Sequence, residues 1–348
     1  MRKKVVLVTG ANGEMGHGLI QYLAENTDAN IVALDVVPLD KSLRPLCSTY
    51  IVGDILDQML LGRLVVEHEI STIYHLASIL STKAEYNPET AHRINVEGTM
   101  NLLRLAVEQS QWQGTSVKFI YPSSIAAYGI PTLREKSLAD ATVETDWNFP
   151  TTMYGCNKLY CEHLGRYYNS HYRQLAIDCG GTQTVDFRSI RFPGLISAET
   201  TPTGGTSDYG PEMLHAAAQG ETYNCFVRPD TTIPFMIMPD AVKALVLLED
   251  VPKNRLSQFV YNVTSFSLSA QQIFDIVKEA FPDANIHFAV DDCRQKIVDT
   301  WPAELDDSAA CRDWDWAPDY NCHRSFNEYL IPAIRERYQK ISKTKEKI

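Results

Sequence analysis

The strongest constraint on the fold lies in the first 35 residues, where a strand, a glycine-rich turn, a helix and a second strand follow one another. Glycines in such a turn let the backbone bend sharply and lie close to a pyrophosphate at the positive end of the helix. The second strand, 31–35, ends in Asp35, whose carboxylate can accept hydrogen bonds from ribose hydroxyls and repel a 2'-phosphate. This pattern predicts NAD binding, with selection against NADP, by Asp35 and by the turn Thr9-Gly10-Ala11-Asn12-Gly13-Glu14-Met15-Gly16.

The same alternation of short apolar strands and amphipathic helices continues to about residue 192. Further strands are expected at 73–77, 118–123 and 186–191, and helices at 57–68, 88–110 and 153–171. These strands lack an alternation of apolar and polar residues, which is typical of parallel strands covered by helices on both faces. The predicted fold class is α/β, with residues 1–192 forming a Rossmann-type, doubly wound parallel sheet.

The pattern changes after Pro193. A loop rich in Gly, Pro and Thr occupies 200–207, although a helix at 240–249 and a strand at 259–263 could return to the sheet. We expect residues 193–339 to form a smaller mixed α/β lobe that covers the carboxyl ends of the strands, where open α/β folds bind ligands. The charged tail, 340–348, is expected to fray.

Composition argues against several classes of function. The chain has 32 Lys and Arg against 43 Asp and Glu, and its net charge of -11 would repel a nucleic acid. Because no apolar run is long enough to span a membrane or act as a secretion signal, we expect a cytoplasmic protein. The eight cysteines form no C-x-x-C pair and the nine histidines form no H-E-x-x-H motif, which favours reduced thiols and no metal.

Residues after the next two strands are further candidates for cofactor contacts. Asp54, followed by Ile55, closes a predicted strand. Its carboxylate either reaches an adenine amino group or is a solvated loop acid, and the sequence leaves both open. In Leu76-Ala77-Ser78, small residues would let the backbone pass close to the cofactor. Asn95, in the helix 88–110, has either a cofactor contact or a structural role.

A serine and a tyrosine–lysine pair carry the chemistry. Ser124 follows a predicted strand, and Tyr154 and Lys158 lie four residues apart on one helix face. A phenol is a poor base at neutral pH, but a neighbouring ammonium and an oxidised nicotinamide both favour the phenolate and lower its pKa. Tyr154 is therefore predicted to be a general base.

Taken in order, the glycine turn, the serine and the Tyr-x-x-x-Lys pair resemble the extended short-chain dehydrogenase/reductase family over nearly the whole chain. Later segments resemble its L-threonine 3-dehydrogenases, namely Arg191-Phe192-Pro193-Gly194, Gly204-Gly205-Thr206-Ser207-Asp208-Tyr209, Trp301-Pro302 and Asp313-Trp314-Asp315-Trp316. The resemblance implies NAD-dependent oxidation of L-threonine at its 3-hydroxyl to 2-amino-3-ketobutyrate. It also implies that Tyr154 removes the hydroxyl proton, Ser124 hydrogen-bonds the developing carbonyl, and Lys158 supports both the tyrosine and the ribose.

The resemblance further implies contacts to the substrate and between subunits. Ser81, Thr206 and Ser207 would lie near the polar groups of the substrate, with Trp301 as a wall and Pro193 beside the cofactor. The glycines at 204 and 205 would act as a hinge when the lobe closes over threonine. A homodimer would form through the helices 88–110 and 153–171.

Some features depart from the family, and two other functions stay open. The stretches 133–149 and 174–184 are longer than usual, and Asn157 replaces a small residue such as Ser, which we treat as neutral. A nucleotide-sugar epimerase would share the scaffold, the NAD and the Ser, Tyr and Lys residues. A non-catalytic NAD sensor is the third possibility, although such proteins commonly lose the tyrosine or lysine that this chain keeps.

Overall fold

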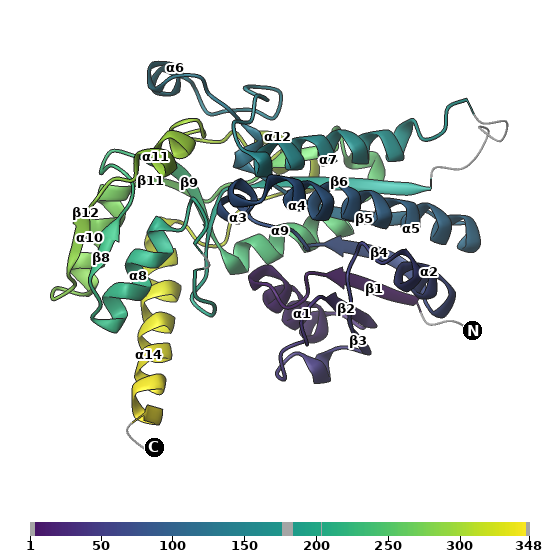
Figure 1. Cartoon of the computed structure of the whole chain (residues 1–348), viewed down its shortest axis with the longest axis horizontal. Helices are drawn as coiled ribbons and strands as arrows, with labels where there is room; N and C mark the ends of the chain where they lie inside the picture. The colour runs from purple at the N-terminus through teal and green to yellow at the C-terminus, as the bar shows by residue number, and fades with distance from the viewer. Residues whose placement is uncertain (1–3, 176–183, 203, 346–348) are drawn as a thin grey trace.

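A seven-stranded parallel sheet with helices on both faces forms the centre of the molecule, and a smaller lobe lies beyond one end of its strands (Figure 1). The computed structural model describes residues 4–175, 184–202 and 204–345. The α/β class and the Rossmann-type sheet expected from the sequence are confirmed.

The strand order of the sheet is β10-β6-β5-β4-β1-β2-β3. These strands span Lys4–Thr9 (β1), Ile31–Asp35 (β2), Thr49–Val52 (β3), Glu69–His75 (β4), Val117–Ser124 (β5), Val185–Phe192 (β6) and Val260–Asn262 (β10). Strand order reverses between β1 and β4, and open α/β sheets bind their ligands at such a point.

Helices cover both faces of the sheet and bury its apolar side chains. One face carries α2 (Gln58–Glu67), α5 (Gly98–Gln113) and α7 (Met153–Ser170), and the other carries α1 (Glu14–Asn26) and α9 (Met238–Asp250). The helix expected at 88–110 consists of α4 (Pro88–His92), a π-helical turn at Arg93–Glu97 and α5. A short helix that the sequence did not predict, α3 (Ser81–Tyr86), follows β4.

Local sequence explains where these helices begin. The side chain of Asp57 accepts hydrogen bonds from the first turn of α2, and Thr152 accepts one from Gly155 N at the start of α7. The residue before α1 is Gly13, which offers no side chain to cap the helix. The backbone N–H groups of its first turn are therefore open to a ligand.

The lobe contains two small sheets and has a core of its own. Its strands are β7 (Gly194–Ile196), β9 (Thr232–Ile237) and β11 (Phe266–Ser269) in one sheet, and β8 (Tyr223–Cys225) and β12 (Ile286–Phe288) in the other. The helices of this part are α8 (Tyr209–Gln219), α10 (Ala270–Ala280), α11 (Asp292–Asp299), α13 (Cys322–Arg324) and α14 (Ile331–Lys345). Its core also includes Ile125, Ala126 and Tyr128, which follow β5 and join the lobe to the sheet.

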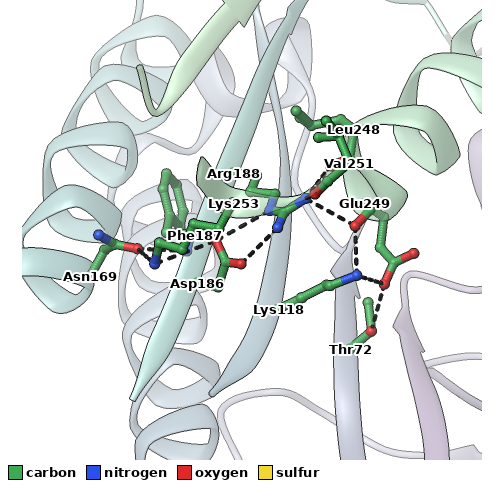
Figure 2. Close-up of polar contacts among 10 residues, drawn as sticks. All are labelled: Thr72, Lys118, Asn169, Asp186, Phe187, Arg188, Leu248, Glu249, Val251 and Lys253. Carbon is green, nitrogen blue, oxygen red and sulfur yellow. Dashed lines mark hydrogen bonds and ion pairs between the residues drawn. The ribbon is translucent and has the colours of Figure 1, made fainter. Parts of the chain in front are cut away.

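The chain crosses between lobe and sheet more than once. After β9 it returns as α9 on the sheet, and β10 then pairs in parallel with β6. Helix α12 (Ser308–Trp314) also packs against the core on the α9 face of the sheet. The guanidinium of Arg188 on β6 holds the end of α9 by donating to the carbonyls of Leu248, Glu249 and Val251 (Figure 2).

Several segments differ from the sequence expectation. Strand β4 ends at His75, so Leu76-Ala77-Ser78 forms the loop beyond it. The longer stretch 133–149 contains α6 (Leu133–Leu138), whereas 176–183, most of the other long stretch, lies outside the described residues. Helix α14 continues to Lys345, through residues that were expected to fray, while its contacts with the lobe core come from its first part, at Ile331, Ala333, Ile334 and Tyr338.

Candidate active site

A cavity of about 320 Å³ lies at the carboxyl ends of the strands, between the sheet and the lobe. Its walls come from the glycine turn after β1, the loop after β4, the end of β5, the start of α7 and the lobe. Most of the predicted site residues line it, namely Gly10, Gly13, Glu14, Met15, Gly16, Leu76, Ser78, Ser81, Ser124, Tyr154, Lys158, Pro193, Ser207 and Trp301.

Two glycines of the turn leave no room for a side chain. Gly10 has a φ of +66°, and a Cβ there would lie 2.5 Å from the backbone nitrogen of Ala77. A Cβ on Gly16 would lie 2.4 Å from the carbonyl oxygen of Ala11. The turn can therefore form only with glycine here, and it brings bare backbone to the start of α1.

Asp35 lies at the end of β2, next to this turn. Its carboxylate accepts hydrogen bonds from the backbone nitrogens of Asn12 at 2.9 Å and Val37 at 3.1 Å. These bonds hold the half-buried side chain in place and leave lone pairs for ribose hydroxyls. The bare turn, the uncapped helix and this carboxylate fit the pyrophosphate and ribose of NAD.

The three predicted catalytic residues meet at the floor of the cavity. A hydrogen bond joins Ser124 and Tyr154, and the Ser124 hydroxyl also accepts from Ala126 N at 3.1 Å. The Lys158 ammonium donates to the carbonyl of Pro122 at 2.7 Å and lies 5.4 Å from the centre of the Tyr154 ring. Because β5 supplies Ser124 and α7 packs beside β5, the sheet fixes this geometry.

Burial controls the protonation of this group. It raises the pKa of Tyr154 well above its usual value, against the smaller opposing effect of the Ser124 hydrogen bond. It also lowers the pKa of Lys158 to about 8. In the protein without cofactor, desolvation of the phenolate is the largest influence on Tyr154, and the lowering of its pKa by the ammonium together with an oxidised nicotinamide stays a prediction.

His75, directly beneath this group, is not available as a base. Its two ring nitrogens hydrogen-bond the hydroxyls of Thr9 and Thr99, each at 2.9 Å. Complete burial lowers its pKa to about 3, with a further contribution from the charge of Lys158. The imidazole therefore stays neutral and links β1, β4 and α5.

The predicted substrate residues separate into two groups. Ser81, Ser207 and Trp301 line the cavity. Thr206 does not: its backbone nitrogen and hydroxyl both donate to the Ser81 hydroxyl, at 3.2 and 3.1 Å. Thr206 is buried against Ser81 behind the cavity wall, and its place near the polar groups of the substrate stays a prediction.

Several predicted cofactor residues lie outside the cavity wall. Asp54 is exposed and accepts from Leu56 N, while Ile55 packs against Gly98. The backbone of Ala77 lies against Gly10. The backbone nitrogen of Asn12 donates to Asp35, and its side-chain oxygen accepts from Asp40 N. The amide of Asn95 is occupied by the loop after β4, which favours its structural role.

The sequence did not reveal a buried network behind Ser124. Glu162 on α7 accepts from the neighbouring Ser123 hydroxyl and, at two positions, from the Arg191 guanidinium. Its spacing of four residues from Lys158 places it on the same helix face, which was the available signal. Also missed were the cavity residues Leu80, Pro122, Ile125, Ala126, Phe192, Gly194, Leu195, Asp208 and Met238.

Other kinds of site receive no support in the described part of the chain. No group of three or more His, Cys, Asp or Glu is arranged there to hold a metal ion. The seven cysteines among these residues are free thiols. No helix that the structure describes has the length and apolar character needed to span a bilayer.

Comparison with known proteins agrees with this geometry. The NAD dependent epimerase/dehydratase family matches residues 6–264. The mitochondrial L-threonine 3-dehydrogenase of Bos taurus is 32% identical over 316 residues, covering 91% of this chain and 79% of that protein.

Solved structures give the same result. A monomeric L-threonine 3-dehydrogenase from a metagenome superposes with a TM-score of 0.83 at 34% identity, covering 96% of this chain and 99% of that one. A GalE-like L-threonine dehydrogenase from Cupriavidus necator, in its holo form, has a TM-score of 0.82 at 34% identity with the same coverage.

Proposed function

The chain belongs to the NAD dependent epimerase/dehydratase family, with NAD as its cofactor, and we propose that it oxidises L-threonine at the 3-hydroxyl to 2-amino-3-ketobutyrate. The observation that carries this proposal is the composition of the cavity. Tyr154, Ser124 and Lys158 share it with serine hydroxyls and the apolar wall of Trp301.

Tyr154 takes the proton of the substrate hydroxyl in this proposal. Its ring lies at the cavity floor, and the Ser124 hydroxyl beside it can donate to the oxygen that becomes a carbonyl. Bound NAD would supply the acceptor for the hydride of the same carbon. Because burial alone favours the neutral phenol, Tyr154 depends on positive charge in the loaded site to act as a base.

Lys158 supplies part of that charge and holds the ribose. Its ammonium is fixed by the Pro122 carbonyl and lies over the Tyr154 ring, so it orients the phenol without an ion pair. With a pKa of about 8, it is largely protonated at neutral pH. This supports its double role toward Tyr154 and the nicotinamide ribose.

The charge of the cavity wall favours threonine over a nucleotide sugar. A sugar nucleotide brings a diphosphate, which proteins bind with Arg and Lys. Among the described residues that line the cavity, the cationic one is Lys158, and the lobe contributes Gly205, Ser207, Asp208 and Trp301 instead. Serine hydroxyls and backbone N–H groups suit a small polar zwitterion.

A parallel assay tests this function. The purified chain is incubated with NAD and either L-threonine or UDP-glucose, while NADH absorbance and UDP-galactose are measured. We expect NADH only with threonine. Interconversion of the UDP-sugars without NADH formation from threonine would instead support the epimerase.

The subunit contact remains part of the proposal. Exposed aromatic side chains on α5 and α7, Trp112, Tyr160 and Tyr167, support a homodimer through these helices. Light scattering is expected to report twice the chain mass. The mass of one chain, the state described for the metagenome relative, would contradict it.

A cytoplasmic location also stays a prediction, which cell fractionation would check.

A further inference from the structure

Two buried asparagines connect the helix of Tyr154 to the substrate side of the cavity. Asn157, one residue before Lys158 on α7, accepts a hydrogen bond on Oδ1 from Asn95 Nδ2 at 3.3 Å. Both side chains are only 2% exposed. Asn157 also donates to the sulfur of Met153, one turn earlier on α7, so its amide is fixed on both sides.

The rest of the Asn95 amide holds the loop after β4. Its Oδ1 accepts from Ile79 N at 2.7 Å and from the Ser78 hydroxyl at 3.1 Å, and its Nδ2 donates to Ile79 O at 3.0 Å. Together with Asn157, these partners use both donors and both lone pairs of the amide. The loop therefore has one hydrogen-bonded arrangement relative to α7.

This loop forms part of the cavity wall, with Ser78 at the end expected beside the cofactor and Ser81 at the end expected beside the substrate. Ser78, Leu80 and Ser81 all line the cavity, and Ser81 accepts two hydrogen bonds from Thr206 of the lobe. An unbroken path thus runs from α7 through Asn157, Asn95 and the loop to the lobe. Each step is a hydrogen bond or a short stretch of backbone.

We propose that Asn157 is a positioning residue, which acts through Asn95 to set the 78–81 wall and its lobe contact relative to Tyr154. A serine at this position is shorter and cannot make the same bond to Asn95. Asn157, which was treated as neutral in the sequence, thereby acquires a role in holding the cavity wall. This inference rests on the proposed function only where threonine kinetics are the readout.

The test compares Asn157→Ser with Asn169→Ser. Asn169 is another buried asparagine on α7, but it holds Phe187 N and Lys253 at the far end of the helix. The KM for threonine should rise about tenfold in Asn157→Ser, because the wall contacts substrate, while kcat changes less and the Kd for NAD stays within about twofold. Asn169→Ser should lower Tm and leave this KM unchanged.

Hydrogen exchange provides a readout that needs no turnover. The Ile79 amide, which donates to Asn95, should exchange about tenfold faster in Asn157→Ser and at the wild-type rate in Asn169→Ser. Unchanged exchange at Ile79 and unchanged KM in Asn157→Ser would overturn the proposal, as would an equal rise of KM in the control. If wild-type protein fails to oxidise threonine, the proposed function fails, and exchange alone decides the role of Asn157.

Discussion

Strands β5 and β6 carry polar side chains at both ends, and the hydrogen-bond and ion-pair partners of these side chains differ between the two ends. At the amino end, Lys118 on β5 and Arg188 on β6 face the last turn of α9 (Figure 2). At the carboxyl end, Ser124 on β5 and Lys158 from the adjoining helix α7 face the cavity. Both ends bury cations, so burial alone does not mark a site.

At the amino end, each cation has carboxylate and carbonyl oxygens as strong hydrogen-bond acceptors. Arg188 pairs with both oxygens of Asp186, at 3.2 and 2.7 Å, and with three helix carbonyls. Lys118 donates to the carbonyl and the carboxylate of Glu249 at 2.7 and 2.9 Å. Cations at a helix C-terminus stabilise its dipole, so this cluster fastens α9 to the sheet.

At the carboxyl end Arg191 is paired with Glu162 at two positions, whereas Lys158, which lines the cavity, has weaker compensation. Lys158 has one carbonyl at 2.7 Å and the faces of two tyrosine rings, and no carboxylate lies within ion-pair distance of it among the described residues. Burial therefore lowers its pKa to about 8. Full pairing of Arg188 and Lys118 thus serves stability, whereas the partial pairing of Lys158 leaves an ammonium that can change protonation.

The largest expected effect separates chemistry from stability at the carboxyl end. Tyr154→Phe removes the phenol oxygen that accepts the proton, so kcat should fall by about 10²- to 10⁴-fold, while Kd for NAD and Tm change little. Steady-state kinetics measure kcat, NAD titration measures Kd, and thermal denaturation measures Tm. Turnover close to that of the wild type would place the base elsewhere and remove the contrast between the two ends.

The opposite pattern is expected at the amino end. Arg188→Met leaves Asp186 buried without its main partner and uncaps α9, which should cost about 3–5 kcal/mol of unfolding free energy. Urea denaturation measures this loss, and kcat per folded molecule should stay within about twofold. The double variant Arg188→Met/Asp186→Leu should recover part of the stability. A fall in kcat at unchanged stability would mean that the cluster serves the site.

A smaller effect concerns the pH dependence of stability. The pKa of Lys158 is about 8 when folded and near 10.5 in an exposed lysine, so the unfolded chain binds more protons between these values. The destabilisation from burying the ammonium is complete below pH 8 and disappears as pH rises toward 10.5. Without NAD, Lys158→Met should therefore be more stable than wild type at pH 7, by a margin that shrinks above pH 8. A margin that is constant with pH would contradict this assignment.

Sequence alone predicted those features that depend on neighbouring residues. The turn from Gly10 to Gly16, Asp35 and the Tyr154–Lys158 pair all rely on short spacings, and the structure brings them to one edge of the sheet. The alternation of strands and helices was sufficient for the fold class, because it reflects local periodicity and burial on both faces.

Contacts between distant segments could not be obtained in this way. Asn157 and Asn95 are 62 positions apart, and Thr206 meets Ser81 across 125 positions, so no spacing indicates either contact. Asp54 shows the same limit: it follows a strand, its carboxylate accepts from Leu56 N and is exposed, and its contact with adenine stays a prediction. Such polar residues acquire their roles from tertiary packing.

The most direct test of the account follows the hydrogen that leaves the substrate. The protein is supplied with NAD and L-threonine that carries deuterium at C3, and the NADH formed is analysed by mass spectrometry. If Tyr154 removes the hydroxyl proton while hydride leaves C3, each NADH carries one deuterium and the product is 2-amino-3-ketobutyrate. NADH without deuterium, or no reduction of NAD at all, would contradict the proposed reaction.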